Sequence, residues 1–165
     1  MKKIILLLAL LLPLGVFAQE IKIAVVDASA IFNLMPELDA AEKEMAAVEE
    51  KYTTEHKTMQ DEFNLKYEDY MKVEATLTDN LKTRRQTELQ DLQARIQNFL
   101  QLAQEDIPRE QQRIYAPIQE KITTAIKAVG DEQGYTLIVS PQYMLYVGKT
   151  TIDATPFVKA KLGIK

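Results

Sequence analysis

The strongest constraint on this chain is a long stretch without helix-breaking residues. No glycine lies between Gly15 and Gly130, and no proline lies between Pro36 and Pro108. Glycine and proline are the residues that most clearly interrupt helices, whereas Glu, Lys, Gln, Ala, Leu and Met favour them and are abundant here. We therefore expect very long helix over a large part of the chain, flanked on both sides by short segments typical of strands.

The apolar residues of this interval predict a helical arm that folds back on itself. They recur every three or four residues from Leu38 to Leu77, with a break near Glu55, and again from Leu81 to Val129, with an offset near Ile107. Such spacing is typical of helices that pack against a partner helix. Between the two runs, Thr76 to Asn80 is rich in residues that favour the N-cap of a helix. We predict two antiparallel helices joined by a turn, a helical hairpin over residues 36–129.

Three prolines bear on the shape of this arm. Pro36 fits the first turn of the first helix, where its missing N–H costs nothing. Pro108 and Pro117 fall inside the second helix, toward the end that leads back to the strand segments. Because each removes a backbone donor and crowds the preceding turn, we expect bends near the root of the arm.

The segments on both sides of the arm predict a small β body, so that the fold class is α+β. Residues 19–35 hold a first strand, and residues 130–165 are expected to hold a strand hairpin, Tyr135–Ser140 with Tyr143–Val147, and a C-terminal helix. Three short strands bury little apolar surface, and theirs are apolar on both faces. We therefore expect several copies to associate through the body, with the interface at Ile23, Val25, Leu137 and Val139.

The first 18 residues have the pattern of a secretory signal peptide. Lys2 and Lys3 precede an apolar run that ends at Phe17, with small residues at the cleavage positions. The run is shorter than the ~20 apolar residues of a membrane-spanning helix. We expect cleavage after Ala18 and a mature protein in the bacterial periplasm. The chain has no cysteine, which excludes lipidation at this junction, disulfides and thiolate chemistry.

Charge and motifs argue against several classes of function. The formal net charge of −4 falls to −6 once Lys2 and Lys3 are removed (−4 − 2), so nucleic-acid binding is not expected. His56 is the single histidine, and the sequence holds no glycine-rich phosphate loop, Ser-His-Asp set or zinc-ligand spacing. We predict neither an enzyme nor a protein with a metal or other cofactor.

Several segments resemble, in order and spacing, the Skp/OmpH family of periplasmic chaperones. They are Ile23–Asp27, Ile31–Asn33, Met35–Glu37, Pro117–Ile118, Glu120–Ile122, Gly134–Tyr135, Leu145–Tyr146 and Asp153–Thr155. The resemblance implies a homotrimer in which a trimerisation barrel carries three hairpin tentacles around unfolded outer-membrane proteins. Well-known members are strongly basic and contact acidic lipid or lipopolysaccharide through their tentacles. Such contact is not expected of this acidic chain.

The residues and the resemblance together predict an ATP-independent holdase that binds unfolded outer-membrane proteins and prevents their aggregation. A structural coiled-coil adaptor or spacer in the cell envelope is the alternative. Soft or amphipathic side chains on the first helix are the candidates for client contact, although they could instead fill the seam between the helices: Met45, Met59, Phe63, Tyr67, Tyr70 and Met71. Since Tyr70 and Met71 are adjacent, one of them is expected to point off the seam.

A small basic cluster lies near the predicted tip of the arm. Lys82, Arg84 and Arg85 could contact acidic lipid or steer a client electrostatically. They could equally be ordinary charges of a solvated helix start, and acidic residues follow them at Glu88 and Asp91.

Overall fold

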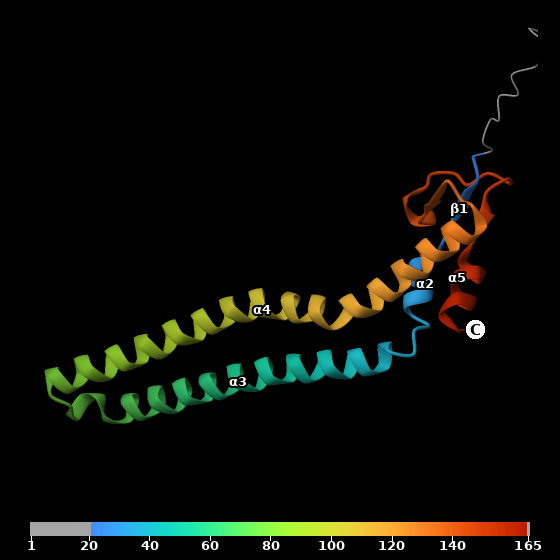
Figure 1. Ribbon diagram of the computed structural model, residues 1–165. Helices are drawn as coiled ribbons and strands as arrows, with labels where there is room; N and C mark the ends of the chain where they lie inside the picture. Colours follow the sequence, from blue (N-terminus) through green and yellow to red (C-terminus); the bar gives the residue numbers. More distant parts are fainter. Residues whose placement is uncertain (1–20, 165) are drawn as a thin grey trace, which may run out of the picture.

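The computed structural model describes residues 21–164, so the predicted signal peptide and its cleavage after Ala18 lie outside the described residues. A long two-helix arm projects from a small body (Figure 1). In chain order the elements are β1 (Ile23–Val25), α2 (Ala28–Phe32), α3 (Leu38–Val73), the 3-10 turn η2 (Glu74–Thr76), α4 (Asp79–Gln133), β2 (Leu137–Val139), the 3-10 turn η3 (Pro141–Tyr143), β3 (Ile152–Asp153) and α5 (Thr155–Leu162).

The arm consists of α3 and the first part of α4, which runs beside it (Figure 1). The chain reverses at η2, where Leu77 is extended and Thr78 occupies the N-cap position of α4 without a side-chain capping bond. Contacts between the helices join Glu44 to Arg113 and Lys66 to Glu88, so that early residues of α3 meet late residues of α4. At ~1.5 Å per residue, the 36 residues of α3 span roughly 54 Å.

The two prolines inside α4 do not end the helix. Pro108 and Pro117 both lie within it, and α4 bends as it leaves the arm and enters the body (Figure 1). The helix continues to Gln133, beyond the predicted end of the arm at residue 129, and closes at Gly134 with a left-handed φ of 66°. The prediction for Pro36 was wrong, because it lies in the turn before α3 rather than in the first helical turn.

The sheet of the body is parallel, with strand order β2-β1-β3. The predicted hairpin of Tyr135–Ser140 with Tyr143–Val147 is wrong: β2 forms, but the chain then enters η3, and Tyr143–Val147 contains no strand. Pro141 starts this 3-10 turn, and the Met144 N–H is bonded to the Pro141 carbonyl, which carries the chain away from β2. The third strand is instead β3, on the other side of β1.

The core of the body lies between one face of the sheet and the helices α2, α4 and α5. Ala24 and Val26 of the first strand segment are buried there, together with Ile31 of α2 and Val158 of α5. The Asp27 carboxylate accepts a hydrogen bond from the Ala30 N–H at 2.9 Å and so caps α2. From the body the core continues along the arm in a stripe of buried residues that includes Ala41, Met45, Ile114, Ile118 and Ile122.

Candidate functional site

One face of the sheet carries apolar side chains that residues 21–164 leave partly exposed. The register pairs Ile23 with Leu137 and Val25 with Val139, and paired residues of neighbouring strands point to the same side. Ile23 is 39% exposed and Leu137 is 50% exposed, whereas Ala24, on the opposite side, is fully buried. The four residues predicted to lie at an oligomer interface therefore share one partly exposed apolar face.

The segment that follows η3 is the most exposed apolar part of the body. Leu145 is fully exposed, Tyr143 and Tyr146 are 82% and 79% exposed, and Met144 and Val147 are each more than two-fifths exposed. Contiguous apolar surface of this kind marks a site of interaction with another molecule. This surface was not predicted from the sequence, because Tyr143–Val147 was expected to form a strand within the body.

Two of the predicted client-contact residues fill the interior instead. Met45 is buried in the core stripe of the arm, and Tyr70 is buried between α3 and α4. The Tyr70 hydroxyl donates a hydrogen bond to Glu74 at 3.1 Å and accepts one from Gln86 at 2.9 Å. Burial, reinforced by the bond to Glu74, raises the pKa of Tyr70. These two side chains hold the arm together.

The other predicted client-contact residues leave the seam progressively toward the tip. Met59 and Phe63 are half-buried, Tyr67 is 48% exposed and Met71 is 52% exposed. The Phe63 and Tyr67 rings are nearly parallel, with centroids 6.2 Å apart. Of the adjacent pair Tyr70 and Met71, Met71 is thus the one that points off the seam.

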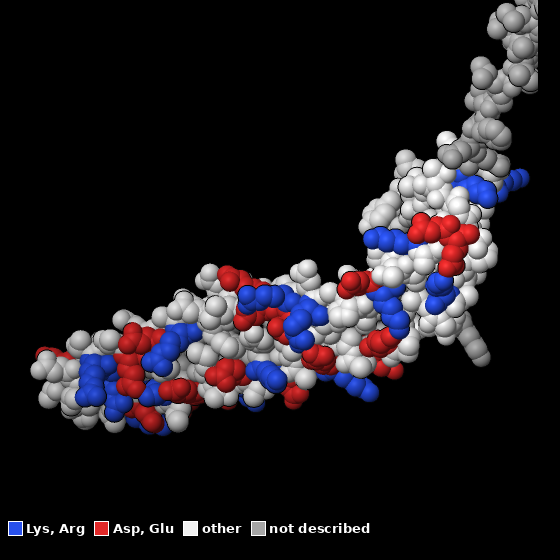
Figure 2. All heavy atoms as spheres, in the orientation of Figure 1, with Lys and Arg blue, Asp and Glu red and all other residues white. Residues whose placement is uncertain are grey.

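The basic cluster near the tip, Lys82, Arg84 and Arg85, lies beside an acidic residue. Arg85 lies 3.5 Å from the Glu88 carboxylate, which also accepts a hydrogen bond from Lys66 of α3. The bond from Lys66 lowers the pKa of Glu88, and the charges of Arg85 and Arg84 act in the same direction. Lys82, Arg84 and Arg85 therefore do not form an isolated cationic patch. Figure 2 shows acidic and basic side chains interspersed along the visible face of the arm.

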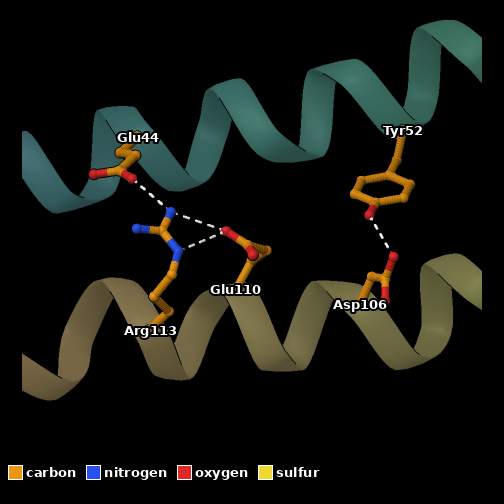
Figure 3. Close-up of polar contacts among 5 residues, drawn as sticks. All are labelled: Glu44, Tyr52, Asp106, Glu110 and Arg113. Carbon is orange, nitrogen blue, oxygen red and sulfur yellow. Dashed lines mark hydrogen bonds and ion pairs between the residues drawn. The ribbon is translucent and has the colours of Figure 1, made fainter.

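Further polar contacts join α3 to α4 nearer the body. Arg113 of α4 lies 2.7 Å from Glu44 of α3 and 2.8 Å from Glu110, and these carboxylates raise the pKa of the guanidinium (Figure 3). The Tyr52 hydroxyl donates to Asp106 at 3.0 Å, and the Tyr52 ring packs against Phe99 with centroids 5.8 Å apart. These contacts bridge the stretch around Glu55 where the apolar seam is interrupted.

A cleft of about 520 Å³ lies between α2 and α4. Its lining contains no ionisable side chain and consists of Ala28, Ser29, Phe32, Asn33, Gln119, Ile122, Thr123 and Ile126. Across residues 21–164, no group of three or more His, Cys, Asp or Glu side chains is placed to hold a metal ion. None of the helices within that range is both long and apolar enough to cross a membrane.

Comparison with known proteins places this architecture in a family. The chain resembles the crystal structure of a candidate outer membrane chaperone (OmpH-like) from Caulobacter crescentus CB15, with a TM-score of 0.72 and 13% sequence identity over 87% of this chain and 84% of that one. No curated protein matches the chain. The family described as outer membrane protein (OmpH-like) matches residues 22–162. Since this match spans nearly all of the described residues, the chain belongs to the OmpH-like family.

Proposed function

We propose that this protein is an ATP-independent holdase chaperone of the bacterial periplasm that binds unfolded outer-membrane proteins and prevents their aggregation. The observation that carries the proposal is the combination of a long projecting arm with an uncovered apolar body, in a chain that belongs to the OmpH-like family. The OmpH-like neighbour from Caulobacter crescentus, whose name describes a candidate outer membrane chaperone, supports the same role.

The body is proposed to assemble into a homotrimer, the state that the family resemblance implies. The outward face of the sheet, at Ile23, Val25, Leu137 and Val139, and the exposed segment Tyr143–Val147 supply the apolar surface for this contact. The outer strands β2 and β3 also offer edges for pairing, and closing three sheets into one barrel would remove those edges. Such an assembly gives three arms a common base.

A holdase of this kind works by keeping aggregation-prone strands apart. Unfolded β-barrel proteins expose apolar segments that pair with one another, and many weak contacts with the arms would compete with that pairing. Each contact is weak, so the client leaves when folding in the outer membrane is more favourable. No nucleotide hydrolysis is needed for this release.

Light scattering tests the proposal. A urea-unfolded outer-membrane β-barrel protein is diluted into buffer with an equimolar amount of trimer or with an equal mass of an inert protein as control. We expect scattering to fall strongly with the trimer only. Unchanged scattering would refute the holdase function. Pull-down from an envelope extract separates the alternative, because a structural adaptor would retain one dominant folded partner rather than many barrel proteins.

A further inference from the structure

A stripe of glutamines runs along one side of α4. Its members are all exposed and follow one another at intervals of three or four residues: Gln86, Gln90, Gln93, Gln97, Gln101 and Gln104. At roughly 100° per residue, they fall within about 80° of the helix circumference. From Gln86 to Gln104 the charged residues are Glu88, Asp91 and Arg95, and the same geometry places all three on the other side of α4.

The neighbouring side of α3 carries few charges as well. Gln60, Asn64, Tyr67 and Met71 recur at the same helical spacing, and the Gln60 side chain donates to Asn64 at 3.2 Å. Tyr67 and Met71 are about half exposed. This side of α3 therefore offers amide groups together with soft apolar surface, with Lys57 and Glu68 along its edge.

Ion pairing across the seam shows that these two sides share one face of the arm. Lys66 of α3 pairs with Glu88 of α4, which brings the charged flanks of the two helices together. On α3, Tyr67 lies on the opposite flank of the seam from Lys66, just as Gln93 of α4 lies opposite Glu88. We call this shared surface the amide face, defined as Gln60, Asn64, Tyr67 and Met71 of α3 with the six glutamines of α4.

We propose that the amide face binds the backbone of an extended, unfolded polypeptide segment, an inference that rests on the proposed function. A glutamine side chain offers one carbonyl acceptor and two N–H donors, so it can bond either the N–H or the C=O groups of an extended chain. Because every polypeptide presents these groups, such bonding is independent of client sequence. Tyr67 and Met71 add contact with apolar client side chains.

The chemistry of the amide face favours an extended polypeptide over an anionic lipid and over a second helical arm. An anionic lipid headgroup would be recognised by cations, and the amide face has none. A second arm packing on it as a coiled coil would require apolar residues at the seam positions, whereas this stripe holds glutamines. An uncharged face also lets a client chain approach without removing water from charged groups, which is costly. The ion pair of Lys66 with Glu88 lies on the opposite flank of the seam.

Site-specific crosslinking locates the bound chain. The sequence contains no cysteine, so Gln93→Cys and Asp91→Cys each create a single labelling site on opposite sides of α4. Each variant carries a benzophenone maleimide and is illuminated with a urea-unfolded outer-membrane β-barrel protein or with phosphatidylglycerol vesicles. We expect the client to crosslink at position 93 and not at position 91. Equal crosslinking at both positions, or crosslinking to vesicle lipid at position 93 without crosslinking to the client, would overturn the proposal.

A charge-matched pair of variants tests the energetic contribution. Gln90→Glu, Gln93→Glu and Gln97→Glu together lower the charge of the amide face by three, whereas Arg84→Gln, Arg95→Gln and Asn98→Glu lower the charge by three on the side of α4 that carries Glu88 and Asp91. Circular dichroism verifies that both triple variants remain helical. We expect the first to weaken client binding about tenfold or more, because three side chains lose their donors and bring charge to an uncharged site, and the second to bind nearly as wild type.

The outcomes separate this inference from the function on which it rests. If the wild-type protein does not bind the unfolded client, the proposed function fails. If the wild-type protein binds and both triple variants bind equally well, the chaperone function stands and the amide face is wrong as the binding surface.

Discussion

Leu145→Ala is predicted to weaken self-association without affecting the fold of the single chain. Leu145 is fully exposed and lies in a segment outside the strands and helices of the body. Its side chain therefore adds no packing energy within one chain. If the copies associate through the segment Tyr143–Val147, the same side chain becomes buried against a neighbouring copy.

The magnitude follows from the area that this side chain exposes. Truncation of leucine to alanine removes three carbon atoms, worth roughly 2 kcal/mol per copy when the side chain is fully buried. In a trimer the loss is about 6 kcal/mol, or roughly four orders of magnitude in the association constant at ~1.4 kcal/mol per tenfold. For three-body assembly, the concentration of half-dissociation varies as the square root of the dissociation constant and should rise ~100-fold.

Sedimentation velocity across a range of protein concentrations measures this shift. Leu65→Ala is the matched control, because Leu65 is 61% exposed but lies on the arm, away from the body. We expect the control to dissociate at the same concentration as the wild type. Identical dissociation curves for Leu145→Ala and the wild type would refute the assignment of this segment to the interface, and a wild type that is monomeric throughout would refute the assembly itself.

The remaining predictions concern the stability of the single chain. Ile118→Ala, at a position only 4% exposed in the core, should lower the free energy of unfolding by about 2–5 kcal/mol in a denaturant titration. Gly134→Ala should cost about 1 kcal/mol in thermal unfolding because φ is 66° there, whereas Gly148→Ala should be nearly neutral because a Cβ would meet only ordinary contact at 3.6 Å. The hydrogen bond from Lys66 holds the pKa of Glu88 below its ordinary value of 4.5, so this pair stabilises the fold above that pH and loses its contribution as pH falls through the folded-state pKa. Glu88→Gln should therefore unfold at lower denaturant than the wild type at neutral pH and converge with it in acid; a constant difference across pH would contradict this.

The arm could be predicted from the sequence because its signals are local and repeated. The absence of glycine and proline, the three-and-four spacing of apolar residues and the polar turn near Thr78 all act within a few residues of one another. Pro108 and Pro117 were correctly placed inside the return helix for the same reason. Helix propensity summed over so many residues strongly favours helix over any other secondary structure.

The body could not be predicted in the same detail. Tyr143–Val147 has the composition of a strand, but a strand needs a partner, and Pro141 turns the chain away from β2 before a hairpin can form. The strand that does form, Ile152–Asp153, is too short to carry any periodic signal. Its position is set by pairing with β1, which is far away in the sequence. Local sequence patterns do not predict such a pairing.

The candidate client-binding surface, too, could be predicted only in part from the sequence. Met45 and Tyr70 were candidates for client contact that could instead fill the seam, and their helical phase directs both into the seam. The glutamine stripe of α4 was not predicted, because a single glutamine does not indicate a catalytic or ligand-binding site. Counting the spacing of the glutamines would have revealed the stripe, but its place beside Tyr67 and Met71 depends on how α3 and α4 pack.

The mass of the complex with one unfolded client tests the central claim most directly. The purified mature protein is mixed with a urea-unfolded outer-membrane β-barrel protein, the urea is diluted, and the complex is weighed by native mass spectrometry, with circular dichroism used to verify that the client has not folded. We expect a complex of three copies with one unfolded client. A protein that forms no complex, or that binds the client as a single copy, would contradict it.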